Sequence, residues 1–144
     1  MKAKIFLIAL LLVSFTVFAQ ETKVPKIVKD SFTKLYPKVT DVKSDKEGKT
    51  EFEAGFKENG KDVSVVFDEK GNLIETETAI QINELPKSAA SFVEKNYTGF
   101  RISEAAKIIS AKGEVTFEAE ITKDKVKKDL LFDSKGNIDQ KDMS

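Results

Sequence analysis

The chain has 144 residues, with 24 basic and 24 acidic side chains and with no cysteine, histidine or tryptophan. Imidazole bases, thiolate nucleophiles, disulfides and ordinary zinc sites all need histidine or cysteine, so the composition excludes them. We therefore expect no enzyme, and we predict no catalytic residue, no cofactor and no metal site.

The first 19 residues have the pattern of a cleavable signal peptide. Lys2 and Lys4 precede an uncharged run of 14 residues, and the segment 17–19 suits signal peptidase. A membrane anchor is the alternative, but a spanning helix needs about 20 apolar residues. We expect cleavage after Ala19, which makes residues 1–19 a signal peptide. The mature protein would then be periplasmic or secreted, with no membrane contact after cleavage.

The mature chain, residues 20–144, is nearly neutral. Without Lys2 and Lys4 it has 22 basic and 24 acidic residues, a net charge of −2. All its basic residues except Arg101 are lysines, which are poor bidentate ligands for phosphates and bases. We therefore predict no binding of nucleic acid. The length suits one domain that folds without disulfides.

An internal repeat divides this domain. Residues 66–73 (VFDEKGNL) recur at 131–138 (LFDSKGNI), and residues 50–54 recur at 115–119, both at an offset of 65. A recurrence in one register indicates a duplicated structural unit. We interpret the chain as two repeats, residues 24–81 and 82–144, and we expect them to share one core that contains Phe52, Phe67, Phe117 and Phe132.

Each repeat opens with a helix signal. Pro25 and Pro86 suit the start of a helix, where a missing N–H costs nothing. Apolar residues follow at helical spacing in both repeats. They are Ile27, Val28, Phe32, Leu35 and Tyr36 in the first repeat, and Ala89, Phe92, Val93 and Tyr97 in the second.

Alternating residues after each helix predict strands joined by hairpins. Asn59-Gly60 is a strong two-residue turn signal. It sets a register of Glu58 with Lys61, Lys57 with Asp62, Phe56 with Val63, Ala54 with Val65 and Phe52 with Phe67. The second hairpin, with its turn at residues 124–125, would pair Phe117 with Phe132, Ala119 with Leu130 and Glu120 with Asp129. The last pair would repel unless Lys127 or Lys128 screens it, so this register is less firmly specified.

Two further strands complete each repeat. The leading strands are expected at residues 39–45 and 102–110, and the trailing strands at 73–81 and 138–143. Alternation turns Ile74 and Thr76 inward, whereas the repeat favours Leu73, and a β-bulge after Gly71 would reconcile the two. The predicted fold class is α+β, with two tandem copies of a helix followed by a four-stranded antiparallel meander.

The order of these motifs resembles that of a known family. Val24-Pro25, Tyr36-Pro37, residues 52–56, Leu85-Pro86 and the turns Phe67-Asp68-x-x-Gly71 and Phe132-Asp133-x-x-Gly136 are similar to those of the PepSY-like, β-lactamase-inhibitor-like exported bacterial proteins. Members often have tryptophan where this chain has Ser44. The resemblance implies helices packed on one face of the sheet, an open opposite face and no catalytic residue.

Three local features are candidate sites. The segments that begin at Asp68 and Asp133 faintly resemble calcium loops, but lysine replaces an oxygen ligand and a plain β-turn explains them better. Glu51 and Glu53 resemble a glycosidase pair without an apolar pocket to raise one pKa. The inferred registers also place apolar residues beside carboxylates on the outward face. This candidate partner face comprises Glu51, Glu53, Val66, Glu118 and Leu131.

These observations favour a non-enzymatic exported binding module. The resemblance implies an inhibitor-like domain that acts on a peptidase or another envelope enzyme, so the expected partner is an envelope protein. The alternative is a periplasmic carrier of a small ligand or ion, although the sequence shows no pocket signature for one.

Overall fold

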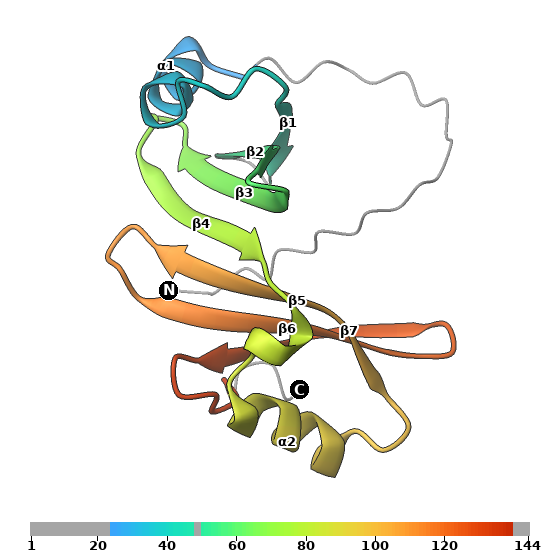
Figure 1. The fold of residues 1–144 in the computed structure, drawn as a ribbon. Helices are drawn as coiled ribbons and strands as arrows, with labels where there is room; N and C mark the ends of the chain where they lie inside the picture. Colours follow the sequence, from blue (N-terminus) through green and yellow to red (C-terminus); the bar gives the residue numbers. More distant parts are fainter. Residues whose placement is uncertain (1–23, 48–49, 140–144) are drawn as a thin grey trace.

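A computed structural model describes residues 24–47 and 50–139 of the chain. This part of the chain forms a seven-stranded antiparallel sheet in which the order of the strands follows the sequence (Figure 1). The elements are α1 (Lys26–Leu35), β1 (Lys43–Glu47), β2 (Glu51–Glu58), β3 (Lys61–Asp68), β4 (Leu73–Ala79), the 3₁₀ helix η1 (Ile82–Glu84), α2 (Lys87–Asn96), β5 (Arg101–Ser110), β6 (Val115–Lys123) and β7 (Val126–Asp133). No described helix is both long and apolar enough to cross a bilayer. The predicted α+β class is confirmed.

The sheet runs without a break between the two predicted repeats. β4 pairs with β5 over five residue pairs, from Glu75 with Ser110 to Ala79 with Ala106. Figure 1 shows α1 beside β1–β3 and α2 beside β5–β7, toward opposite ends of the molecule. This pairing makes one meander of seven strands.

The strand boundaries differ from the expected ones in two places. β1 begins at Lys43 and not at Val39, because Val39 packs against the side chains beneath α1. After β7, the described chain forms only an isolated bridge between Phe132 and Ile138. The described part of the second repeat therefore has three strands and not four, and residues 140–144 lie outside the described residues.

Both hairpins have the predicted registers. Asn59 and Gly60 have positive φ angles of 51° and 79°, as a mirror-image turn requires, and the five predicted pairs of the first hairpin are present. The second hairpin also has its predicted pairs, although its turn has a positive φ only at Asp124. Lys127 Nζ lies 3.0 Å from Glu120 Oε2 and so screens the Glu120 and Asp129 pair.

A β-bulge at the start of β4 resolves the two expectations for this strand. Phe67 pairs with Leu73 and Val66 pairs with Glu75, so the register shifts by one residue between them. Leu73 packs against the α1 cluster, while Thr76 pairs with Val65 on the same face. Both sets of positions can therefore face the helix, as a bulge after Gly71 predicts.

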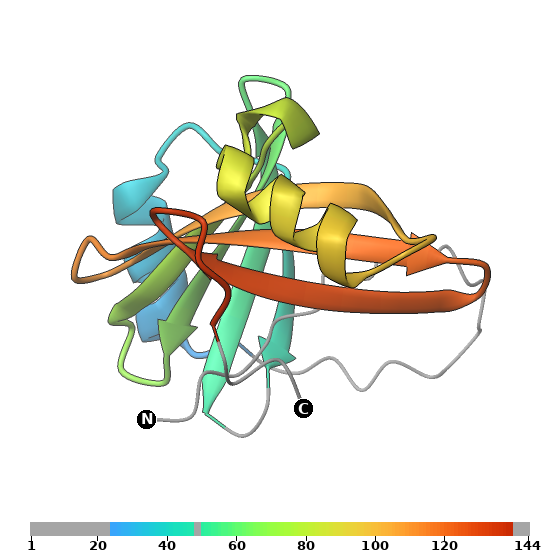
Figure 2. The same ribbon diagram turned by 90° about the horizontal axis from the view of Figure 1, so that it is seen from below.

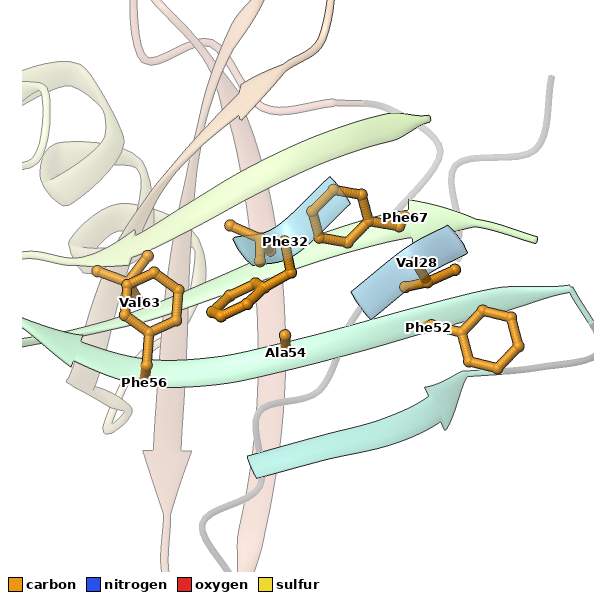
Figure 3. Close-up of a cluster of buried hydrophobic side chains, with 8 residues drawn as sticks. Val28, Phe32, Phe52, Ala54, Phe56, Val63 and Phe67 are labelled. Atoms are coloured by element: carbon orange, nitrogen blue, oxygen red, sulfur yellow. The ribbon is translucent and has the colours of Figure 1, made fainter. Parts of the chain in front are cut away.

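The buried apolar side chains form two clusters, so the expectation of one shared core is wrong. The α1 cluster comprises Val28, Phe32, Phe52, Ala54, Phe56, Val63, Val65 and Phe67 (Figure 3). The α2 cluster comprises Leu85, Ala89, Val93, Ala105, Ala119, Ile121, Leu130 and Phe132. Each helix contacts its own half of a long sheet, which keeps the clusters apart.

Helix α1 buries a narrower stripe than predicted. In α1, Val28 and Phe32 are buried, but Ile27 and Leu35 are 52% and 50% exposed. Successive helical residues are about 100° apart, so Ile27 points away from the row that Val28 and Phe32 form.

Two glycine turns fit tightly beneath the helices. Gly71 has a φ of 78°, and a Cβ atom there would lie 2.7 Å from Ser31 Oγ and 2.9 Å from the Ile27 carbonyl oxygen of α1. Gly136 has the same conformation, and a Cβ there would collide with Ser88 of α2. Asp68 Oδ1 accepts hydrogen bonds from the Lys70 and Asn72 amides, which confirms the interpretation of this segment as a turn.

Gly71→Ala should therefore destabilise the protein more than Gly60→Ala. Both glycines have positive φ, which costs alanine about 1 to 2 kcal/mol, but Gly60 has open space around it. The contact with α1 should add about 1 to 3 kcal/mol at Gly71. Urea unfolding of both variants measures the difference. Equal losses of unfolding free energy in the two variants would show that α1 does not clash with an alanine side chain at position 71.

Candidate binding groove on the outer face of the sheet

The side chains that contact α1 and α2 point to the same side of the sheet. Val65 of the α1 cluster pairs with Thr76, Thr76 pairs with Ile109, and Ile109 pairs with Val115. Directly paired residues share a face, as do residues an even number of positions apart, so Ala119 of the α2 cluster faces the same way as Val115. The opposite face, here called the groove face, is covered by neither α1 nor α2.

A groove of about 1090 Å³ lies along the groove face. Its lining residues include ones from the segment before β1 and from each strand between β2 and β7. The lining carboxylates are Glu53, Glu77, Glu104, Glu118, Glu120 and Asp129, with Asp41 and Asp62 at the margins. Ala79 and Ala106 are apolar lining residues on this face, and three lysines, Lys38, Lys43 and Lys57, also line the groove. The groove therefore combines apolar surface with a concentration of negative charge.

Glu118 is one of three buried carboxyl groups of this groove, with Glu77 and Glu120. It stands on β6 between Ala106 of β5 and Leu131 of β7, and it is 8% exposed. Its Oε2 atom has no hydrogen-bond partner in the described part of the chain. A buried acceptor without a partner costs about 1 to 3 kcal/mol. Neither flanking side chain can donate a hydrogen bond, so these two neighbours leave Glu118 Oε2 without a donor.

Burial and the negative charges of nearby carboxylates together raise the pKa of Glu118 to about 8, and burial is the largest of these causes. These neighbours are, in decreasing order of effect, Glu77, Asp129, Glu120 and Glu75. Burial also raises the pKa of Glu75 and of Asp129, each with help from a neighbouring carboxylate. Glu118 is therefore mostly protonated at neutral pH.

Glu120 lies two residues along the same strand and has the opposite environment. Burial would raise its pKa, but hydrogen bonds from Ser103 and Lys127 outweigh that effect and lower it. Ser103 Oγ donates to Oε1 at 2.6 Å, and Lys127 Nζ lies 3.1 Å from Oε1 and 3.0 Å from Oε2. Both oxygens of Glu120 are thus engaged within the protein. Glu53 is likewise bound, by the Ser64 hydroxyl.

The structure brings together only part of the predicted partner face. Glu53 and Glu118 line the groove, and the pairs of Glu53 with Val66 and of Glu118 with Leu131 are as predicted. Val66 and Leu131 are only 4% and 8% exposed, so their expected role as exposed apolar contacts is wrong. Glu51 is not a lining residue, because it pairs with Asp68 at the far end of β2.

Sequence reasoning missed the groove itself. Glu77 and Asp129 both lie at outward positions of their strands, and this alternation was the available signal. The predicted hairpin of β6 and β7 brings Asp129 near Glu118, whereas the approach of Glu77 depends on the pairing of β4 with β5, which no sequence motif specifies. The sequence showed no pocket signature, yet the structure has a groove on this face of the sheet.

The family comparison identifies the class of protein. The family model described as "Putative beta-lactamase-inhibitor-like, PepSY-like" matches residues 15–75 and 52–140. These segments cover most of the sequence, so the chain belongs to the PepSY-like family. Among curated proteins, none matches the chain.

Solved structures from Bacteroides species share the fold. A BLIP-like protein from Bacteroides fragilis has 25% sequence identity and a TM-score of 0.64, with 82% of this chain and 84% of that one covered. A protein described as a "putative periplasmic" protein from Bacteroides eggerthii has 19% identity and a TM-score of 0.71, with coverage of 81% and 86%. A DUF2874 family protein from Bacteroides uniformis has 23% identity and a TM-score of 0.68, with coverage of 79% and 85%.

The raised pKa of Glu118 predicts a specific dependence of stability on pH. The folded protein holds one more proton than the unfolded chain between about pH 4.5 and pH 8, so the free energy of unfolding should fall as pH rises through this window. Glu118→Gln cannot ionise, so it should remove most of this fall. At pH 8.5 this variant should be more stable than the wild type by about 2 to 4 kcal/mol.

Urea unfolding at pH 5.5 and pH 8.5 measures this effect. The control is Glu94→Gln, which removes one charge from an exposed position on α2 and should behave like the wild type. If the wild type and Glu118→Gln lose the same stability between the two pH values, then Glu118 does not titrate in this range.

Proposed function

We propose that the protein is an exported, non-enzymatic binding module that binds an envelope protein through its groove face. The observation that carries this proposal is the groove around Glu118, which combines apolar surface, more carboxylates than lysines and a buried carboxyl oxygen without a hydrogen-bond partner in the described part of the chain. The family description and the BLIP-like structure favour an inhibitor-like role toward a peptidase or another envelope enzyme.

The dimensions of the groove suit a protein partner. β2 and β7 are separated by five interstrand spacings of about 4.8 Å, so the groove extends roughly 24 Å across the sheet. A standard interface buries about 800 Å² on each partner, which corresponds to a patch roughly 28 Å wide. A rigid sheet also loses little conformational freedom when it binds.

Binding explains the groove better than catalysis does. Glu118 and Glu120 have pKa values displaced in opposite directions, as an acid and base pair would. However, Ser103 and Lys127 occupy both oxygens of Glu120, so this carboxylate is not available as a base. A carrier of a small ligand or ion is the second candidate, because the groove is large enough to hold one.

The signal-peptide pattern and a neighbour described as a "putative periplasmic" protein support residence outside the cytoplasm. We infer cleavage after Ala19, and the expected intact mass of the exported protein is that of a chain that begins at Gln20.

The tandem arrangement of two repeats is also part of this proposal. Its support is the matching turns at Asp68 and Asp133, whose carboxylates accept the same set of hydrogen bonds.

Site-specific photocrosslinking in envelope extract tests the proposed function. A photoreactive amino acid at the exposed, groove-lining Glu104 should crosslink an envelope protein, and the same amino acid at Glu94 on α2 should not. Glu104→Lys should weaken capture of that protein at least tenfold in a competition assay. Equal crosslinking from both positions, or crosslinking from Glu94 alone, would contradict binding through the groove face.

A further inference from the structure

We propose that the groove receives a lysine or arginine side chain of a protein partner, and that this cation pairs with Glu118 Oε2. The inference rests on the proposed function and adds the chemistry of the partner. Three observations support it: the unpartnered oxygen, the sign of the surrounding charge and the shape of the groove.

The first observation is the unpartnered oxygen. Among the buried carboxylates of the groove, Glu120 accepts from Ser103 and Lys127, whereas Glu118 Oε2 has no donor in the described part of the chain. Glu118 is only 8% exposed, so it is more than nine-tenths buried, and it lines the groove. A donor that enters the groove is therefore the group that can satisfy this atom.

The second observation is the sign of the charge around Glu118. The groups that act on it are Glu75 and Glu77 of β4, Glu120 of β6 and Asp129 of β7, all of them acidic. β5 contributes the uncharged Ala106 beside it. Lys127 of β7 is already bound to Glu120, Lys128 pairs with Ile121 on the helix face, and the lysines that line the groove are Lys38, Lys43 and Lys57. An entering cation is attracted by all four carboxylates, and it favours the ionised form of Glu118.

The third observation is the shape of the groove, which favours a side chain over a free ion. No group of three acidic residues in the described ranges is arranged to hold a metal ion. The groove crosses several strands and is partly apolar, with Ala79 and Ala106 in its lining. The aliphatic stem of lysine or arginine packs on apolar surface while its charged end forms an ion pair. The rest of a partner's chain can then occupy the remaining length of the groove.

Calorimetric titration of the mature chain with short peptides tests the proposal. The probe is an acetylated, amidated Val-Thr-Lys-Thr-Val peptide, and the matched control peptide has norleucine in place of lysine. We expect the lysine peptide to bind at least tenfold more tightly than the norleucine peptide at pH 8.5. Glu118→Gln should remove this difference, and Glu94→Gln on α2 should retain it.

Binding should also release a proton. With a pKa of about 8, Glu118 should lose about 0.9 proton at pH 7 when the cation binds, and affinity should rise nearly tenfold from pH 6 to pH 7. Titrations in buffers with different ionisation enthalpies measure the proton count. No difference between the two peptides, or a difference that survives in Glu118→Gln, would overturn the proposal.

A second arm separates a protein partner from a free amine. n-Butylammonium carries the same cation without a peptide chain, so it should bind at least tenfold more weakly than the lysine peptide. Equal affinity would overturn the assignment to a protein side chain and favour a free amine.

If a partner crosslinks at Glu104 but binds Glu118→Gln normally, the proposed function stands and the cation pairing fails. If the lysine peptide binds through Glu118 but no protein crosslinks, the proposed function fails.

Discussion

The pairing of β4 with β5 is the interaction on which the rest of the structure depends. Five consecutive residue pairs join two helix-and-strand units into one sheet, although the units bury separate apolar clusters. Because side chains alternate along each strand, this register also decides which residues share a face. A shift by one residue would place Glu77 and Glu118 on opposite faces of the sheet. The hydrogen bonds of one strand pair thus determine both the architecture and the composition of the groove face.

The two faces of the sheet have different compositions and roles. The face beneath the helices holds the phenylalanine-rich clusters, as Figure 3 shows for α1, and the turns at Gly71 and Gly136 fit tightly beneath the helices. Figure 2 shows α2 lying along the strands of its own half. The groove face gathers carboxylates that repel one another and keep Glu118 protonated. Packing on one face therefore supplies the stability that lets the other face carry an unfavourable concentration of charge.

Short-range features of this fold were predictable from sequence, and long-range ones were not. Asn59-Gly60 specifies the first hairpin through backbone conformation, and Gly71 together with the apolar pattern indicated the bulge at Leu73. Alternation correctly placed Val66 and Leu131 on the outward face, but it gives no information about depth, so their burial was missed. The groove was missed for a related reason. It requires the pairing of β4 with β5 and the course of the whole sheet, and both depend on residues distant in sequence.

The titration of Glu118 tests this account most directly, because its environment exists only if β4, β6 and β7 lie as described. The measurement is the ¹³C chemical shift of the Glu118 side-chain carboxyl as a function of pH in the mature protein. The account predicts a midpoint near pH 8, and a lower midpoint in Glu77→Gln, where the carboxylate with the largest charge effect is removed. A midpoint near 4.5 in the wild type would show that Glu118 is solvated or already paired, and would contradict the account of the groove.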